Sequence, residues 1–400
     1  MKIGMMADTY KPHVSGITNY IELNKRALEA AGHSVYIFTF GDEDYPDTES
    51  NIIRSPGIPI TDTGYYLSLR YTRIARKLLQ TMDVVHVHHP FLSGALALTY
   101  AKPLGIPILF TNHTRYDLYS RAYLPALPEG ISETFLRTYL PRFCASCDLV
   151  ISPSPGMRNV LQQLGVTTPI EVVPNGVDFH HLTQPIAPIH RTELGFGDRV
   201  ILLIYVGRLG PEKNLPFLLR AFGGIAQTFE NLALLIVGDG PERDNLQDRV
   251  QHMRLQDKIH FTGMVPYSEI PRYLKTADVF VTASVTEVHP LTVIEAMAVG
   301  LPVIGIQSPG VGDLIEDDTN GLLAQEEDLA IFTAKLARIV TDHAARQRMA
   351  QNARQVSQTY AIERTSDLML QHYQRLVSAA QPGRRSWRIR FNRLLETFRK

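Results

Sequence analysis

Two cations and a glycine follow an apolar run in the second half of the sequence. Gly207, Arg208 and Lys213 come directly after residues 200–206, and a helical pattern begins at Asn214. Glycine lets backbone approach a ligand, and cations beside the first turn of a helix add to its partial positive charge. This pattern is typical of a diphosphate site, but a solvated surface turn has the same composition, so both interpretations stay open.

Two glutamates form a second candidate group. Glu287 precedes a predicted helix at 291–299, and Glu295 lies within it, eight residues further on. A carboxylate can accept two hydrogen bonds from a vicinal diol, so such a pair could hold two sugars of one ligand. The alternative is an acidic residue at a helix start and an ordinary helical glutamate. Glu295 stands among apolar neighbours, however, and a carboxylate buried there needs a partner.

A glycine-containing loop near the N-terminus is a weaker candidate. Gly16 opens a predicted helix after the first strand, where backbone amides could approach a phosphate. The segment is not a G-x-G-x-x-G, so the motif carries little weight alone. Lys11 and His13 in the same loop could touch an acceptor or be solvated, and the sequence does not decide between these.

Histidines and cysteines gather at two other places. His86 and His88 share one face of a predicted strand and His89 follows it, but no carboxylate or cysteine lies near them in sequence, so we expect no metal. Cys144 and Cys147 form a C-x-x-C before a strand. Without another redox signal, we expect packing rather than redox chemistry.

Short apolar strands alternate with helical patterns along both halves of the chain. This alternation predicts α/β architecture with two doubly wound, Rossmann-like domains facing a cleft. We expect an N-terminal domain at 1–180, a C-terminal domain at 181–360, a closing helix at 361–380 that packs back on the first domain, and a tail at 384–400. The predicted strands are 3–7, 34–40, 84–87, 107–110, 148–151, 170–173, 200–206, 232–237, 258–261, 279–282 and 302–306. Two long helices, 327–356 and 361–379, are expected near the end.

Composition narrows the classes of function. The chain has 400 residues, of which 44% are hydrophobic and 20% charged, and this excludes a disordered or collagenous protein. Two cysteines exclude a disulfide scaffold. A net charge of zero argues against nucleic acid as a partner. We see no leader pattern and no membrane-spanning apolar run, and therefore expect a cytoplasmic protein.

The charge is unevenly distributed. Residues 384–400 hold seven basic side chains and one acidic one, which leaves 33 basic against 39 acidic in the rest. On a helix, the apolar side chains of this tail share one face: Trp387, Phe391, Leu394, Leu395 and Phe398. A basic amphipathic helix with aromatic residues is typical of interfacial membrane binding. The alternative is a helix that packs on the body of the protein with its arginines in water.

With these residues in view, the sequence resembles the retaining GT-B glycosyltransferases of glycosyltransferase family 4. The likeness covers nearly all of residues 1–380 and is most specific in 207–214, in 237–241 and in the two glutamates. In that family the C-terminal domain binds a nucleotide-sugar. The resemblance therefore implies that Arg208 and Lys213 grip the diphosphate beside Gly207, that Glu295 binds the ribose, and that Glu287 binds the transferred sugar.

The resemblance extends to backbone contacts and to the first domain. Val265 falls near the position whose backbone contacts the base. Many members have a glycine where this chain has Pro290, which lacks an N–H, so the amides of Leu291 and Thr292 are left to face the ligand. This departure affects the contacts to the donor sugar rather than the presence of the donor site.

In the N-terminal domain, the resemblance implies that Gly16 approaches the donor phosphate and that His113 stands beside the reacting sugar. Within the family, the likeness is to the diacylglycerol glucosyltransferases, carried by 7–10, 85–91 and 170–178 among other segments. It implies metal-independent, retaining transfer of a hexose, with UDP-glucose as co-substrate and no other cofactor. The implied acceptor is a membrane glycerolipid, reached by an enzyme peripheral on the cytoplasmic face of the membrane.

Two other functions remain open. One is a glycosyltransferase with a soluble sugar or sugar-phosphate acceptor. The other is a nucleotide-sugar 2-epimerase, which can use two similar domains and would convert the donor with no acceptor present.

Overall fold

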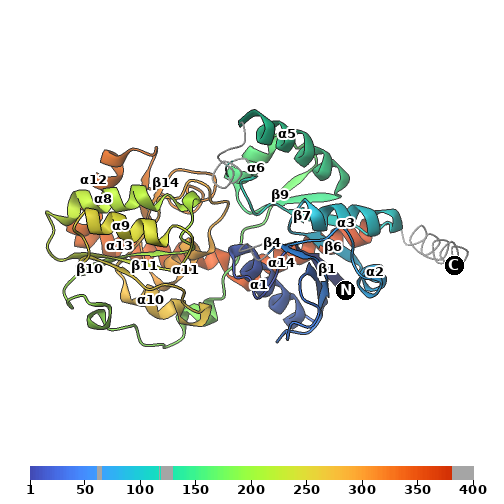
Figure 1. The fold of residues 1–400 in the computed structure, drawn as a ribbon, viewed down its shortest axis with the longest axis horizontal. Coiled ribbons are helices and arrows are strands. Elements are labelled where there is room, and N and C mark those ends of the chain that lie inside the picture. The colour runs from blue at the N-terminus through green and yellow to red at the C-terminus, as the bar shows by residue number, and fades with distance from the viewer. Residues whose placement is uncertain (61–64, 117, 119–128, 381–400) are drawn as a thin grey trace, which may run out of the picture.

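The computed structural model describes residues 1–60, 65–116, 118 and 129–380. These residues form two α/β domains that lie side by side in Figure 1, each built on one parallel sheet. The first sheet has the strand order β3-β2-β1-β6-β7-β8-β9, and the second has the order β12-β11-β10-β13-β14-β15. The expected fold of two doubly wound, Rossmann-like domains is confirmed.

The first domain surrounds its sheet with helices. Its sheet strands are β1 (Lys2–Met6), β2 (Ser34–Phe40), β3 (Ile52–Ser55), β6 (Val84–Val87), β7 (Ile108–Thr111), β8 (Leu149–Ser152) and β9 (Ile170–Val172). Its helices are α1 (Gly16–Ala30), α2 (Arg73–Leu79), α3 (Leu92–Tyr100), α5 (Glu129–Ser146) and α6 (Pro155–Gln163). Strands β4 (Ile58–Ile60) and β5 (Tyr65–Leu67) pair as a separate antiparallel hairpin.

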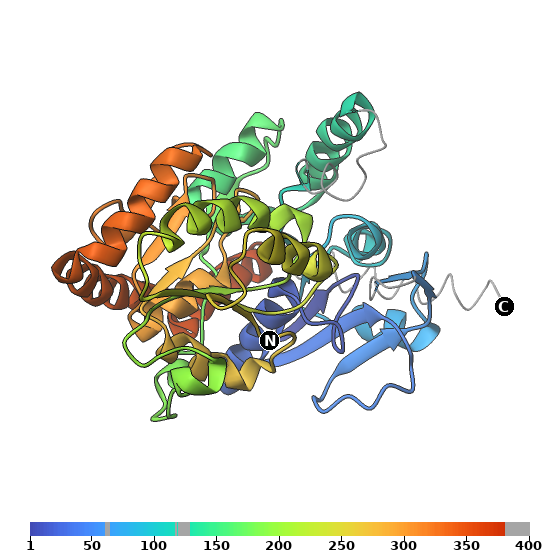
Figure 2. The same cartoon turned by 60° about the vertical axis from the view of Figure 1, so that its left-hand side comes forward.

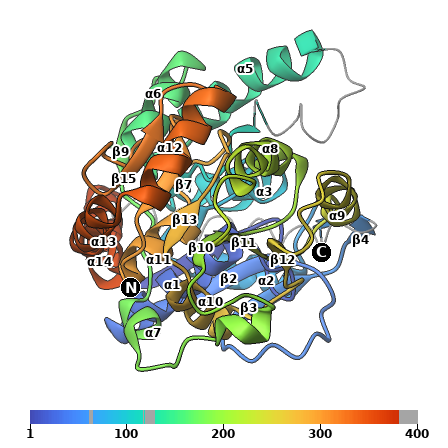
Figure 3. The same ribbon diagram turned by 90° about the vertical axis from the view of Figure 1, so that its left-hand side faces the viewer.

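The second domain repeats this plan. Its strands are β10 (Ile201–Val206), β11 (Leu232–Val237), β12 (Ile259–Phe261), β13 (Val279–Val281), β14 (Val303–Ile306) and β15 (Gly321–Ala324). Its helices are α7 (Phe179–Thr183), α8 (Leu215–Ala226), α9 (Arg243–His252), α10 (Ile270–Thr276), α11 (Leu291–Val299), α12 (Leu329–Thr341) and α13 (His343–Ser357). Figures 2 and 3 turn this domain toward the viewer, and α8 and α10 lie on opposite sides of its sheet in Figure 3.

The central strands read as unbroken apolar runs because both faces of the sheet are buried. Along β10, Leu203 and Tyr205 enter one core cluster, whereas Leu202 and Ile204 enter the cluster on the opposite face. Successive side chains of a strand point to opposite faces, so a strand covered by helices on both sides needs apolar residues at every position.

The chain crosses between the domains earlier than position 180. Val173 belongs to a core cluster of the first domain, whereas Val177 and Leu182 belong to a cluster of the second. Helix α7 packs against α10 and α11. The crossing therefore lies within 173–177, and residues up to 180 are already part of the second domain's packing.

The last described helix, α14 (Ile362–Ala379), packs against α1 and β6 of the first domain. Its Met369 and Tyr373 are buried in the same cluster as Ile3 and Ile21. The segment thus closes back on the first domain after the second one is complete. None of the described helices is long and apolar enough to span a bilayer.

Several local expectations differ from the structure. The region 327–356 is two helices rather than one, because Asp342 ends α12 and its carboxylate accepts a hydrogen bond from the Ala345 N–H at 2.8 Å to begin α13. Strands β3, β4, β5 and β15 were not predicted. The tail at 384–400 lies outside the described residues, so its amphipathic helix stays a prediction.

Candidate functional site

Three loops meet where the central strands of the second sheet end. The Gly238 N–H donates to the Gly263 carbonyl at 3.1 Å, and the Leu209 N–H donates to the Asp239 carbonyl at 2.9 Å. Gly238 has a φ of +135°, and a Cβ there would collide with the carbonyl of Gly207. A side chain at 238 is therefore excluded by the packing of the loop that carries Arg208.

The two candidate cations of that loop have acidic neighbours. Lys213 Nζ lies 2.6 Å from Glu287 Oε1, and both side chains are about one-fifth exposed. Arg208 Nη1 lies 3.9 Å from Glu212 Oε1, and the arginine side chain is about half exposed. The structure thus brings Lys213 and Glu287 together from the ends of β10 and β13, and it leaves Arg208 accessible to a ligand.

Residues that the sequence did not single out fasten these two loops. The hydroxyls of Ser284 and Thr286 both donate to the carbonyl of Glu212, at 3.3 and 3.1 Å. Asn214 adopts a left-handed backbone with a φ of +53°, and its side-chain amide donates to the Ala283 carbonyl. A serine or threonine after a strand is too common a pattern to predict such a clamp.

Glu295 is buried and has one hydrogen-bonded partner among the described residues. Its side chain accepts a hydrogen bond from the Tyr267 hydroxyl at 2.9 Å, and the residue is 2% exposed. Burial raises the pKa of Glu295 to about 7, although the hydrogen bond from Tyr267 acts in the opposite direction. Burial and the neighbouring Glu295 raise the pKa of Tyr267. The partner required by this carboxylate is therefore a tyrosine 28 positions away, which sequence spacing could not indicate.

The start of α11 carries the other predicted donor contacts. Pro290 is the N-cap and makes no side-chain cap hydrogen bond. Leu291 and Thr292 lie in the first turn of α11, where the backbone N–H groups have no acceptors within the helix. Val265 is half-buried beside the core, four residues after β12 ends at Phe261. Val265 thus follows β12 and the two amides follow β13, two strands of the same parallel sheet that are separated by β11 and β10.

In the first domain, Gly16 begins α1 and has open space beside it. A Cβ on Gly16 would meet no atom within 4 Å, and Ser15 caps the helix through the Thr18 N–H. Packing thus gives no reason for a glycine here, which favours close approach by a ligand. Burial and the charge of Arg208 lower the pKa of His13 in the same loop, so this loop faces the second domain's cation. Lys11 instead pairs with Glu22 and Glu49.

His113 belongs to a buried set of histidines. His113 Nε2 lies 3.0 Å from His88 Nδ1, and the two rings stack with centroids 5.3 Å apart. Burial and neighbouring histidines lower the pKa of both imidazoles well below the ordinary value, so both are neutral near pH 7. Because Nε2 of His113 is hydrogen-bonded to His88, only Nδ1 of His113 is left to contact a ligand.

His86 and the two cysteines are buried in the first domain. His86 hydrogen-bonds to the Tyr373 hydroxyl at 2.6 Å and to Thr111 at 2.7 Å. Cys144 and Cys147 are free and buried, and burial raises the pKa of both thiols. Within the described ranges, no group of three His, Cys, Asp or Glu side chains could hold a metal ion. Residues 42–44 form an Asp-x-Asp whose side chains are exposed.

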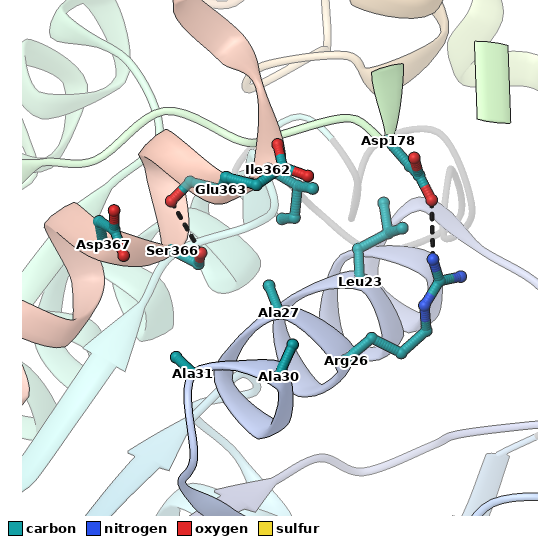
Figure 4. Close-up of a pocket in the computed structure, with 10 residues that line it drawn as sticks. All are labelled: Leu23, Arg26, Ala27, Ala30, Ala31, Asp178, Ile362, Glu363, Ser366 and Asp367. Carbon is teal, nitrogen blue, oxygen red and sulfur yellow. Dashed lines mark hydrogen bonds and ion pairs between the residues drawn. The ribbon is translucent and has the colours of Figure 1, made fainter. Parts of the chain in front are cut away.

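A cavity lies away from the predicted site residues. It has a volume of about 410 Å³ and is formed by α1, Asp178 and the start of α14 (Figure 4). An ion pair between Arg26 and Asp178, at 2.7 Å, bounds it and joins α1 to the segment entering the second domain. None of the predicted site residues lines this cavity.

Comparison with known proteins agrees with the geometry. Residues 14–181 match the model described as Glycosyltransferase Family 4, and residues 187–356 match Glycosyl transferases group 1. An alpha-monoglucosyldiacylglycerol synthase of Streptococcus pneumoniae is 33% identical over 82% of this chain and 77% of its own length. A protein of the same name from Acholeplasma laidlawii is 29% identical over 82% of this chain and 86% of its own.

A solved structure gives the same answer for the fold. Anabaena HepE in complex with UDP and glucose superposes with a TM-score of 0.74 at 19% identity, covering 93% of this chain and 99% of that one. At this identity the likeness supports the fold alone. Together with the two family matches and the relative at 33% identity, it shows that the chain belongs to the GT-B glycosyltransferases of glycosyltransferase family 4.

Proposed function

We propose that this glycosyltransferase moves glucose from UDP-glucose to the hydroxyl of a membrane glycerolipid, with retention of configuration and without a metal. The observation that carries the proposal is the ion pair of Lys213 with Glu287, which joins the cationic loop after β10 to the loop preceding α11, the helix that holds the buried Glu295. The names of two relatives that match over 82% of this chain favour glucose and diacylglycerol. The solved structure that holds UDP and glucose favours UDP.

The donor would be held at both ends. The ionised carboxylate of Glu295 accepts hydrogen bonds from the ribose diol, and the Val265 backbone lies near the base. Arg208 and Lys213 face the diphosphate, and Gly16 leaves room for it from the first domain. Glu287, which holds Lys213 at 2.6 Å in this structure, orients that cation and accepts a hydroxyl of the sugar.

The reaction breaks the bond between the anomeric carbon and the diphosphate oxygen and forms one between that carbon and the acceptor oxygen. The acceptor's proton passes to the leaving diphosphate. Negative charge grows on that leaving oxygen, and Arg208, Lys213 and the first amides of α11 stabilise it. The imidazole of His113 is neutral and offers Nδ1 to the sugar as a hydrogen-bonding group rather than as a charge.

Retention is favoured by the names of the relatives. Both are called alpha-monoglucosyldiacylglycerol synthases, and an alpha product from an alpha-linked nucleotide-sugar requires that attack occurs on the face the diphosphate leaves. For this chain the stereochemistry is read from the anomeric coupling of the isolated product by NMR. A beta-linked product would contradict the proposal.

The tail at 384–400 would keep the enzyme on the cytoplasmic face of the membrane. Its seven basic side chains and apolar face are suited to an anionic interface. Deleting 384–400 should weaken binding to anionic vesicles while hydrolysis of the donor in solution continues. Equal vesicle binding without these residues would discard this anchor.

The deciding experiment measures nucleotide release from a panel of nucleotide-sugars with and without diacylglycerol-containing vesicles. The proposal predicts release of UDP from UDP-glucose that depends on the lipid, with glucosyl-diacylglycerol as product. Release that depends instead on a soluble sugar or sugar phosphate would contradict the lipid acceptor. Conversion of the donor without any acceptor would point to a 2-epimerase.

A further inference from the structure

The hydrogen bond between His88 and His113 joins two neutral imidazoles. His88 Nδ1 and His113 Nε2 are 3.0 Å apart, so one of these nitrogens donates and the other accepts. Both rings are neutral near pH 7, because burial lowers the pKa of each well below the ordinary value. Each ring then carries one proton, and the position of the proton on one ring fixes its position on the other.

The surroundings of His88 decide between the two arrangements. His88 is fully buried, and its Nε2 has no hydrogen-bond partner among the residues that the structure describes. In one arrangement His88 carries its proton on Nδ1 and leaves a bare lone pair at Nε2. In the other it carries the proton on Nε2 and buries an N–H without an acceptor. Orphaned buried N–H groups are the rarer kind of unsatisfied polar group, so the first arrangement is favoured.

The neighbouring imidazole of His86 leaves this choice to His88. His86 Nδ1 lies 2.6 Å from the Tyr373 hydroxyl, and His86 Nε2 lies 2.7 Å from the Thr111 hydroxyl. A hydroxyl can donate or accept, so these two partners satisfy either tautomer of His86. His86 meets His88 ring against ring, with centroids 4.1 Å apart. The tautomer of the His88–His113 pair therefore depends on the environment of His88 Nε2.

Three elements hold the paired rings in place. Strands β6 and β7 are adjacent, and α14 packs against β6 (Figure 1). Tyr20 of α1 meets both rings at a steep angle, with centroid distances of 5.8 Å to His88 and 4.7 Å to His113. His113 itself is only partly buried. Its Nδ1 is therefore the nitrogen of this pair that a ligand can reach.

We propose that His88 fixes the tautomer of His113 that carries its proton on Nδ1, so that His113 contacts the donor sugar as a hydrogen-bond donor to a hydroxyl oxygen. His88 is thus a positioning residue for this contact. A protonated Nδ1 has no lone pair with which to remove the acceptor's proton, so that proton is left to the leaving diphosphate. The inference rests on the proposed function for the identity of the ligand, whereas the tautomer is a property of the free protein.

The test is nitrogen NMR of the full-length protein with isotopically labelled histidine. Long-range correlations between ring protons and ring nitrogens distinguish a protonated nitrogen from a bare one, and loss of signals in His113→Gln identifies those of His113. Without ligand, His113 should be protonated at Nδ1 and bare at Nε2, with the opposite tautomer at about a tenth or less. His88→Phe keeps a ring but removes Nδ1, so the His113 signals should become those of a mixture of tautomers.

The matched control is Tyr373→Phe, which removes a hydroxyl from His86 and leaves the His88–His113 hydrogen bond in place. It should change the signals of His86 and leave those of His113 unchanged. A second measurement adds UDP-glucose or UDP to the unaltered protein. UDP-glucose should shift the Nδ1 proton of His113 and slow its exchange with water, whereas UDP, which has no sugar hydroxyl to accept this hydrogen bond, should leave both unchanged.

A proton on Nε2 of His113 in the unaltered protein would overturn the proposal, whether or not His88→Phe folds. An unchanged His113 tautomer in folded His88→Phe, or equal effects of UDP and UDP-glucose on the Nδ1 proton, would overturn it too. Failure of UDP-glucose to bind, measured by calorimetry, contradicts the proposed function instead, because the tautomer is measured in the free protein.

Discussion

Replacing Glu295 by glutamine should weaken donor binding and make the protein more stable at alkaline pH. The carboxylate is buried, and burial raises its pKa from 4.5 to about 7. At about 1.4 kcal/mol for each pH unit, keeping it ionised in the folded protein costs about 3 kcal/mol above pH 7. Because the folded pKa is raised, this cost is absent below pH 4.5 and grows as pH rises to 7. Glu295→Gln should therefore unfold at higher denaturant concentration at pH 8 and at a similar concentration near pH 4.5.

Glu295→Gln should lower the affinity for the donor although it raises stability at alkaline pH. A charged hydrogen-bond acceptor contributes about 1.5–3 kcal/mol, so Glu295→Gln should raise the Kd for UDP-glucose by about ten- to a hundredfold at pH 8. In the unaltered protein the donor needs the ionised form, so affinity should fall about tenfold from pH 8 to pH 6. The variant has no group to ionise at this position, and its affinity should be nearly constant over that range.

Isothermal titration calorimetry with intact UDP-glucose between pH 6 and pH 8 measures both effects, because the diphosphate of the nucleotide-sugar does not titrate there. Tyr267→Phe is the companion variant. It removes the hydrogen bond that holds the pKa of Glu295 down, so the midpoint of the pH dependence should move upward. Unchanged affinity in Glu295→Gln, or the same pH dependence in both proteins, would refute the assignment of this carboxylate to the ribose.

Three other changes test the remaining parts of the site. Lys213→Ala should lower kcat by about 10²-fold, as expected for loss of one group that stabilises the leaving oxygen, and an unchanged kcat at saturating donor would remove it from that role. His88→Phe keeps a ring but loses the hydrogen bond to His113, so kcat should fall about tenfold while the donor KM stays constant. A change in the donor KM alone would mean that His88 acts in donor binding. Gly238→Ala should lower the free energy of unfolding in urea by about 2 kcal/mol or more. The control is Gly197→Ala, which should not lower it, because a Cβ at position 197 meets no atom within 4 Å. Equal stability of the two variants would contradict the packing of these loops.

The sequence predicted the fold well where burial leaves a strong pattern. The strands of both sheet centres are almost entirely buried, and their continuous apolar runs predicted them to within a residue or two. The edge strand β3 was missed because it is short and carries Arg54 and Ser55. The break between α12 and α13 was missed because helical spacing resumes directly after Asp342, and only the cap reveals the interruption.

The candidate site was predicted where a residue belongs to a short motif that follows a buried strand. Lys213 and Glu287 were singled out separately, and their ion pair follows from adjacent strands ending at one edge. Tyr267 was not found, because it reaches Glu295 from a different loop and has no motif of its own. His88 was considered only as a metal ligand, since its contact with His113 depends on the register of β6 and β7.

A co-crystal structure with UDP-glucose would test the donor pocket most directly. It should place the ribose hydroxyls within hydrogen-bond distance of the Glu295 carboxylate and the diphosphate against Arg208 and Lys213. Density for the nucleotide in the cavity between α1 and α14, or at any position that leaves Glu295 bonded to Tyr267 alone, would contradict the assignment of the pocket.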